Sequence, residues 1–368
     1  MQSLFSLYQC MEANYELSLE FIQEKFLPDL NSMQVQDKPL LAKQKSQAQK
    51  LFENSFRKKV SVVEHADEMI RDTVNEAFVR YEKLSKKDRA LFRKGMVADA
   101  ERIYNHYIGV LSLAVAFAEV AKADKKVSHK NFISNAWIEG IGNSEELKKE
   151  SLRLGRSWDG KMVMVRSWFR DVVREDAEYQ SNLDRKKPSE DEQKKFANYF
   201  FRKIILGKNN INDQFEEDVL MWVEDKEIVK GMVEKTIKAF DPTDSAALSL
   251  HALSLNWDED KEFMEKLYDE AIDLEPHYRE LIAQNTRNWE VERLPLTDRI
   301  ILEMAIAELL NFPSIPVKVT INEYIELAKN YSTPKSRQFI NGILDVIAKE
   351  LKDSGSIRKS GRGLIDNK

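Results

Sequence analysis

The sequence predicts an all-α protein, and three observations support this. Only 12 of its 368 residues are Gly and 9 are Pro, so residues that break helices are scarce. Hydrophobic residues make up 42% and charged residues 32%, a balance typical of long amphipathic helices. Apolar residues recur at steps of three and four along most of the chain, as on one face of a helix. We therefore expect at least about 60% helix and no substantial sheet.

Net charge and cysteine content exclude several classes of protein. The formal net charge is −5, whereas proteins that bind nucleic acid indiscriminately carry a basic excess. Any RNA binding must therefore come from a local patch or from a surface shared with a partner. No apolar run approaches the roughly 20 residues that span a membrane, and no secretory pattern opens the chain. Cys10 is the only cysteine, so no disulfide can form within one chain. These features predict a cytoplasmic location.

The first helix is expected over residues 1–27, within a first region of residues 1–36 that also holds the start of a linker. Its apolar stripe has helical spacing, and Pro28 ends it. The stripe comprises Leu4, Phe5, Tyr8, Met11, Tyr15 and Leu19. Residues 31–50 are polar, rich in Gln and Lys, and contain Pro39, so they are expected to form a linker or a frayed helix.

Residues 37–195 are expected to form a helical insertion of unknown role. Several long helices are predicted there, and the Met-Val run at 162–165 has a helical continuation that disfavours a strand. A charged break at residues 184–192 contains Pro188 and marks its end. Residues 196–258 form a further helical segment. Phe201 and Trp222 there are echoed by Phe263 and Trp289 at an unequal spacing, which indicates either a degenerate repeat or two ordinary amphipathic helices.

The sequence gives no support for an enzyme. Its five histidines lie at no metal-ligand spacing, and one cysteine cannot build a thiolate zinc site. No phosphate-binding loop ending in Gly-Lys-Ser/Thr is present. Gly140 and Gly142 follow no strand, so a helix-ending turn is the better interpretation. We expect no cofactor and no metal ion.

Residues 259–353 carry the clearest pattern, which includes three consecutive helices. In the first of them, Glu308 lies beside Leu309, near the edge of the apolar stripe. The second is expected to begin at Pro316, and the third near Ser336. Gly342 interrupts the stripe of the third helix, so a close neighbour is expected to need the space. The stripes are Ile300, Ile301, Met304, Ala305 and Leu309; Val317, Ile321, Tyr324, Ile325 and Ala328; and Phe339, Ile340, Ile343, Ile347 and Leu351. Residues 354–368 hold three Gly and scattered charges and are expected to be disordered.

About 60 residues of this region resemble the NusB family of transcription antitermination factors. The match is near-continuous across five segments, and Gln2-Ser3-Leu4-Phe5 is similar to a motif in the family's first helix. The segments are Trp289 with Arg293-Leu294 and Asp298-Arg299; residues 304–309; residues 315–323; residues 326–329; and residues 339–345. The resemblance implies a pair of small helical bundles, to which this chain adds a large helical region.

The resemblance also implies partners and sites. Proteins of this family bind boxA-type RNA together with NusE, a small-subunit ribosomal protein, within the transcription elongation complex during ribosomal RNA transcription. Glu308 matches the position that contacts NusE, although a solvated helix residue is an equal alternative. The positions implied for RNA binding are Gln2, Lys329, Lys335, Arg337 and Phe339. Phe339 has a core role as its alternative.

Two departures from the family leave alternatives open. An arginine-rich segment precedes the first-helix motif in the family, whereas this sequence starts at Met1-Gln2. Residues 37–258 also separate the first helix from the rest of the matching region. A protein-only helical scaffold is therefore a second hypothesis, and a homodimer is left open. The accessory domain of a ribosomal RNA cytosine methyltransferase is a third, disfavoured because no strand series is predicted and Cys10 lies on a helical stripe.

Overall fold

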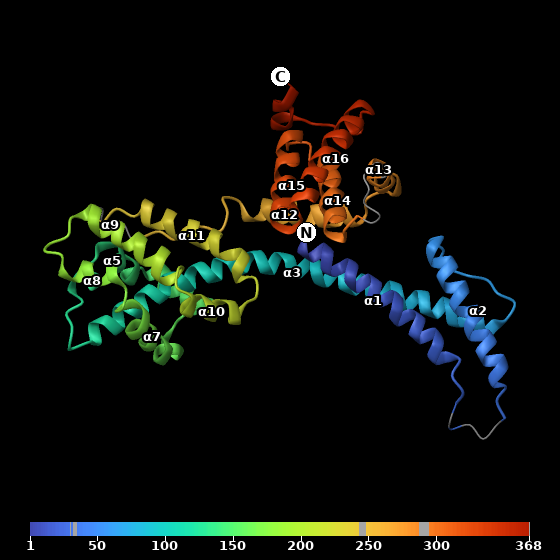
Figure 1. Cartoon of the computed structure of the whole chain (residues 1–368), viewed down its shortest axis with the longest axis horizontal. Helices are drawn as coiled ribbons and strands as arrows, with labels where there is room; N and C mark the ends of the chain where they lie inside the picture. The colour runs from blue at the N-terminus through green and yellow to red at the C-terminus, as the bar shows by residue number, and fades with distance from the viewer. Residues whose placement is uncertain (30, 32–34, 243–247, 287–293, 368) are drawn as a thin grey trace. The chain divides into compact units, whose positions relative to one another are not determined.

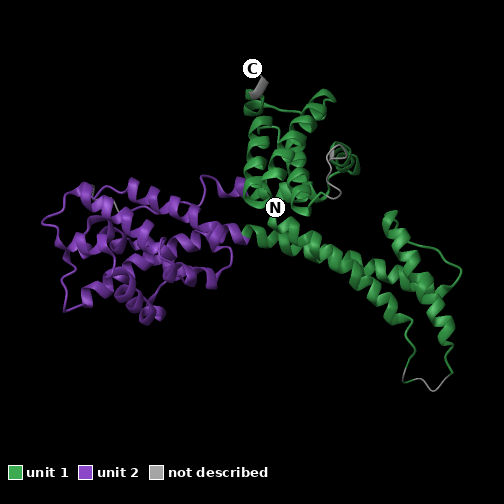
Figure 2. Ribbon diagram, in the orientation of Figure 1, with its two compact units in different colours: residues 1–97, 261–368 green, residues 98–260 purple. Residues whose placement is uncertain are grey.

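The computed structural model describes residues 1–29, 31, 35–242, 248–286 and 294–367 (Figure 1). It is 78% helical, and no strand occurs among those residues. The all-α prediction is confirmed. Two compact units are formed, one by residues 1–97 and 261–368 and the other by residues 98–260 (Figure 2).

Five helices form a bundle in the first unit. They are α12 (Trp257–Ile272), α13 (Pro276–Thr286), α14 (Leu296–Asn311), α15 (Val317–Tyr331) and α16 (Pro334–Asp353). Every residue of α14 from Ile300 to Leu309 is buried, so the other helices surround it. Leu4 and Leu7 of α1 (Gln2–Lys25) are buried in the same core. The N-terminal half of α1 therefore packs with this bundle.

The rest of α1 packs against α2 (Lys38–Arg57) and the start of α3 (Glu68–Ala123). We call this three-helix part of the first unit the arm. Its core consists of Ile22, Phe26, Ala48, Phe52, Val63, Ile70, Val74, Ala77 and Phe78. The expected linker at residues 31–50 is largely ordered helix. Pro39 fits because it lies in the first turn of α2, where a backbone N–H has no helical partner, and the Asp37 side chain accepts a hydrogen bond from Leu40 N at 3.0 Å.

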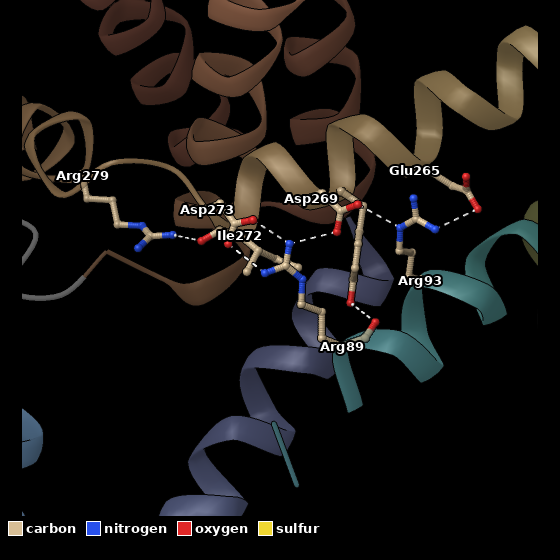
Figure 3. Close-up of polar contacts among 8 residues, drawn as sticks. Arg89, Arg93, Glu265, Asp269, Ile272, Asp273 and Arg279 are labelled. Atoms are coloured by element: carbon tan, nitrogen blue, oxygen red, sulfur yellow. Dashed lines mark hydrogen bonds and ion pairs between the residues drawn. The ribbon is translucent and has the colours of Figure 1, made fainter. Parts of the chain in front are cut away.

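Ion pairs join α3 to α12 within the first unit (Figure 3). The Arg89 guanidinium donates to both oxygens of Asp273 at 2.7 and 2.6 Å and to Asp269 at 2.9 Å. Arg93 donates to Asp269 at 2.8 Å and lies 3.1 Å from Glu265. These hydrogen bonds to carboxylates raise the pKa of Arg89. A network with a bidentate arginine holds its geometry better than isolated surface pairs do, so it fixes the junction of arm and bundle.

The second unit is built around the C-terminal part of α3. Short helices cover it: α4 (Lys130–Ile133), α5 (Ala136–Asn143), α6 (Glu145–Arg153), α7 (Met162–Trp168), α8 (Ala177–Asp184), α9 (Glu190–Tyr199), α10 (Asn209–Asp218) and α11 (Trp222–Ala239), with π-helical turns η2 (Phe169–Val173) and η3 (Phe200–Ile205) and the 3-10 turn η1 (Asp159–Lys161). Residues 162–165 lie in α7, as their continuation predicts. An 18-residue window of α3 reaches a mean hydropathy of 1.3, and 67% of it is buried inside the protein. Burial of this kind is typical of a core helix.

The C-terminal segment differs from the disorder expected for it. Residues Gly361–Asn367 form the 3-10 helix η4. The Ser360 N–H donates to Pro313 O at 2.9 Å, and Lys359 Nζ donates to Phe312 O at 3.0 Å. A Cβ at Gly363 would collide with Pro313 O, so glycine permits this close approach. Composition alone predicted disorder because it does not reveal a docking partner 47 residues upstream.

Candidate functional site

Gln2 lies at the turn between α15 and α16. Its side-chain amide donates a hydrogen bond to the Tyr331 hydroxyl at 3.3 Å, at the surface of the bundle. Leu4 and Leu7, which follow on α1, are buried and hold this end of the helix in place. The fold therefore brings Gln2 to a turn that lies 329 positions away in the sequence.

The basic residues implied for RNA binding flank the same turn. Lys329, in the last turn of α15, is exposed and forms an ion pair with Glu326. Lys335 is exposed in the first turn of α16, and Arg337 is half-buried two residues further on. Gln2 and these three cations thus gather at one end of the bundle, although the chain supplies them from both of its ends.

Phe339 lies in the bundle core and is only 5% exposed. It belongs to one cluster with Ile340, Ile343 and Leu344. An aromatic ring that stacks on a base must present one face to solvent. The burial of Phe339 therefore supports the core role among the two alternatives.

Glu308 is buried rather than placed at the edge of its helix. Its side chain is 6% exposed, and it accepts a hydrogen bond from the Tyr324 hydroxyl of α15 at 3.0 Å. Burial raises the pKa of this carboxyl, while hydrogen bonds from Thr320 and Tyr324 act in the opposite direction. The solvated-residue alternative is wrong, because α14 is buried on all sides near its C-terminal end.

Helix α14 carries two further buried carboxylates, for which the sequence predicted no role. Glu303 is 3% exposed and accepts a hydrogen bond from the Tyr8 hydroxyl at 2.6 Å, with Arg279 Nε 3.3 Å away. Asp298 is 1% exposed and accepts a hydrogen bond from Ser332.

These carboxylates recur every five residues. With Glu308, they form a series at positions 298, 303 and 308. Five residues turn a helix by about 140° beyond a full turn, so each carboxylate points to a different neighbour. The sequence does show these three acidic residues within an apolar run. Acidic residues are buried in such a run only when a partner group offsets their charge.

Part of the implied motif cannot be placed. Trp289 and Arg293 lie outside the described residues. Trp289 is also the second tryptophan of the candidate repeat, so part of that repeat lies outside the described residues as well. In the part of the chain that the structure describes, no group of three or more His, Cys, Asp or Glu side chains is arranged to hold a metal ion.

Comparison with known proteins shows which family the bundle region resembles. The NusB family model matches residues 249–349. A transcription antitermination protein NusB from Salinibacter ruber (strain DSM 13855 / M31) is 44% identical over 141 residues, which are 37% of this chain and 88% of that protein. Proteins of the same name from Chloroherpeton thalassium (strain ATCC 35110 / GB-78) and Dictyoglomus turgidum (strain DSM 6724 / Z-1310) are each 40% identical.

Coverage differs among these relatives. The Chloroherpeton match spans 144 residues, 38% of this chain and 62% of that protein. The Dictyoglomus match spans 104 residues, 28% of this chain and 70% of that protein. No solved structure matches the chain at a significant level. Because the Salinibacter protein is matched over most of its length at 44% identity, and the family model covers the bundle, the chain belongs to the NusB family.

Proposed function

We propose that the chain is a cytoplasmic, non-enzymatic antitermination factor that binds boxA-type RNA together with NusE in the transcription elongation complex. All three relatives are named transcription antitermination protein NusB, which supports the first part of this proposal. The RNA and the protein partner come from the family resemblance of residues 289–345.

One observation carries the RNA-binding part. The hydrogen bond from Gln2 to Tyr331 assembles a polar, basic surface at the α15–α16 turn from residues at both ends of the chain. Phosphate contacts from Lys and Arg provide most of the affinity for RNA, while amide side chains can contact sugar, phosphate or bases. Gln2, Lys329, Lys335 and Arg337 provide both kinds of group.

The same surface argues for a partner. Lys329 is balanced by Glu326, so this surface alone offers few phosphate contacts. We propose that NusE completes the surface. Glu308 remains the candidate partner position. Because it is buried and accepts a hydrogen bond from Tyr324, we propose that it acts indirectly, by holding α15 in place for NusE.

The test measures the binding of fluorescein-labelled boxA-type RNA to the full chain, with and without purified NusE. Affinity is expected to rise at least about tenfold, or about 1.4 kcal/mol, when NusE is added. The double substitution Lys335→Glu with Arg337→Glu should abolish this gain, and circular dichroism should confirm that the variant is folded.

Two results would contradict the proposal. Tight, sequence-selective RNA binding by the isolated chain, unaffected by the double substitution, would place the RNA surface elsewhere. Binding of NusE without any RNA binding by the complex would instead support the protein-only scaffold.

A further inference from the structure

Helix α2 of the arm is strongly basic. Residues 38–59 contain seven Lys or Arg residues and one acidic residue, Glu53, which gives a local net charge of +6 in a chain of net charge −5. The seven are Lys38, Lys43, Lys45, Lys50, Arg57, Lys58 and Lys59. Six are exposed and Lys45 is half-buried. Within the described part of the chain, none of them forms an ion pair.

The exposed cations of α2 are aligned. Lys43, Lys50 and Arg57 are spaced by seven residues, so they lie on one face of the helix, each about 10 Å from the next. Ala48, Phe52 and Ser55 form the opposite, buried face. Some other cations of the arm are paired with carboxylates, as Lys25 is with Glu76. The row on α2 is therefore a stripe of uncompensated charge.

An apolar pocket of about 550 Å³ adjoins the C-terminal end of this stripe. It is lined by Phe56, Val60, Phe78 and Tyr81, together with Arg57 of the stripe and Lys59, which follows α2. One acidic residue, Glu82, also lines it. The Phe56 and Tyr81 rings meet edge to face at a centroid distance of 5.0 Å, and both are only partly buried. The volume falls within the roughly 300–1,000 Å³ of ligand pockets.

The charge of the stripe and the shape of the adjoining pocket together indicate which ligand binds there. A row of cations that ends at a partly open aromatic pocket matches single-stranded nucleic acid, which offers phosphates along its backbone and bases that stack on rings. An amphipathic helix that lies on a membrane needs large apolar residues beside its cations, whereas the exposed face of α2 between Lys43 and Arg57 is polar. The acidic row Glu12, Glu16, Glu20 and Glu24 on the exposed face of α1 would repel phosphates and so confine the strand to α2.

We propose that α2 and the adjoining pocket form a second RNA-binding site, which takes single-stranded RNA flanking the boxA-type element. The inference rests on the proposed function only in its choice of RNA as the ligand. The site itself is independent of that function, because it is far in sequence from the α15–α16 turn and shares no residue with it.

The experiment uses the full chain and two labelled RNAs, a short one with only the boxA-type element and a longer one with single-stranded flanks. The variant Lys43→Gln/Lys50→Gln/Arg57→Gln removes the stripe. Lys83→Gln/Lys86→Gln/Lys87→Gln is the matched control, because it removes the same charge from exposed residues of α3 in the same arm. Dissociation constants are measured across a range of salt concentrations.

The stripe variant should bind the longer RNA at least tenfold more weakly than the wild type and the control do. Its salt dependence should be shallower by about 2, since each of three lost phosphate contacts contributes about 0.7 for a single strand. Binding of the short RNA, in the presence of NusE, should not change.

Lys59 offers a variant in which binding and stability are expected to separate. Its φ of 56° is left-handed, a conformation that costs free energy for every residue except glycine. Lys59→Gly should therefore unfold at the same or higher denaturant concentration while it binds the longer RNA more weakly. A loss of affinity accompanied by a loss of stability would indicate that Lys59 has only a structural role.

The results that would contradict the second RNA-binding site can be told apart from those that would contradict the proposed function. Equal weakening by the stripe variant and the control would reduce the effect to net charge and overturn the inference. Equal affinity of the stripe for single-stranded DNA of the same sequence, or preference for anionic phospholipid vesicles, would overturn the commitment to RNA. If Lys335→Glu with Arg337→Glu leaves binding intact while the stripe variant abolishes it, the proposed function fails and the arm site stands.

Discussion

The Tyr8 hydroxyl donates a 2.6 Å hydrogen bond to Glu303 Oε2, which joins the first helix of the chain to the buried centre of the bundle across 295 positions. Arg279 and Arg299 approach the other oxygen of Glu303 at 3.3 and 3.9 Å, and the Arg299 guanidinium lies over the Tyr8 ring. Burial and the nearby Glu303 carboxylate raise the pKa of Tyr8. The hydroxyl therefore remains protonated and donating at neutral pH.

Tyr8→Phe should destabilise the protein by about 2 kcal/mol, because one oxygen of a buried carboxylate loses its donor. Urea denaturation followed by circular dichroism measures this change. Tyr278→Phe is the matched control, since the Tyr278 ring is partly exposed, contacts the His277 ring at a tilt of 42° and has no hydroxyl partner among the described residues. A cost for Tyr8→Phe no larger than that of the control would show that the arginines alone satisfy Glu303.

Substitutions of Glu308 should show how the charge of this buried carboxylate affects the stability of the fold. Burial raises the pKa of Glu308, so ionisation costs stability in the folded state. This cost is absent below the usual glutamate pKa of about 4.5 and grows as the pH rises towards the folded pKa. Glu308→Gln should therefore be more stable than the wild type at neutral pH, by a margin that shrinks as the pH falls.

Glu308→Lys should lose about 3–5 kcal/mol, because it buries an ammonium group without a partner. Thermal unfolding of both variants from pH 4 to 8, a range that begins below the usual glutamate pKa, provides the comparison. A constant difference between Glu308→Gln and the wild type across that window would show that the carboxylate is ionised without cost.

Gly342 is a site where a small change should stabilise the fold. The close neighbour expected from its place within α16 is absent, because a Cβ there would meet no atom within 4 Å. Alanine in a helix interior is favoured over glycine by about 1 kcal/mol, so Gly342→Ala should raise stability by about that amount. Gly140→Ala is the contrasting variant, since its Cβ would collide with the Phe240 ring. Destabilisation by Gly342→Ala in urea denaturation would contradict the structure at this position.

Periodicity predicted the helices of the bundle well and the surroundings of single residues poorly. The stripes of α15 and α16 recur in the core, and α16 begins at Pro334, two residues before the expected start, because Thr333 caps it by accepting a hydrogen bond from Ser336 N at 3.1 Å. Glu308 was misplaced because α14 is buried on every side and has no polar edge from which a stripe can be measured.

Contacts between residues distant in sequence had no local signal. The hydrogen bond from Gln2 to Tyr331 depends on how α1 docks on the bundle, and no spacing within either helix encodes it. The same holds for Arg89 with Asp273, where each residue taken alone is an ordinary charge on a helix surface. The basic stripe of α2 was visible as composition, but its Lys- and Gln-rich pattern left a linker and a frayed helix as alternatives. Only the packed face with Phe52 shows that it is a helix.

A buried His-Asp pair in the second unit leads to the last prediction. His106 Nε2 lies 3.9 Å from Asp225 Oδ2, and neither atom has a hydrogen-bond partner among the described residues. Burial lowers the pKa of His106 to about 4, with Arg156 and Arg102 acting in the same direction and Asp218 opposing them. Burial likewise raises the pKa of Asp225 to about 6, against the effect of Arg102, while Asp99 and Glu224 raise it further.

The two shifts should have opposite effects on stability between about pH 4 and 6. The unfolded state binds more protons at His106, so that group alone makes stability fall as the pH is lowered. The folded state binds more protons at Asp225, so that group alone makes stability rise as the pH is lowered. Relative to the wild type, Asp225→Asn should therefore lose stability on acidification, and His106→Gln should gain it, each with a slope close to one proton. Urea midpoints at several pH values measure both slopes, and circular dichroism confirms that each variant is folded. Slopes of the same sign for the two variants would show that burial does not shift the two pKa values in opposite directions.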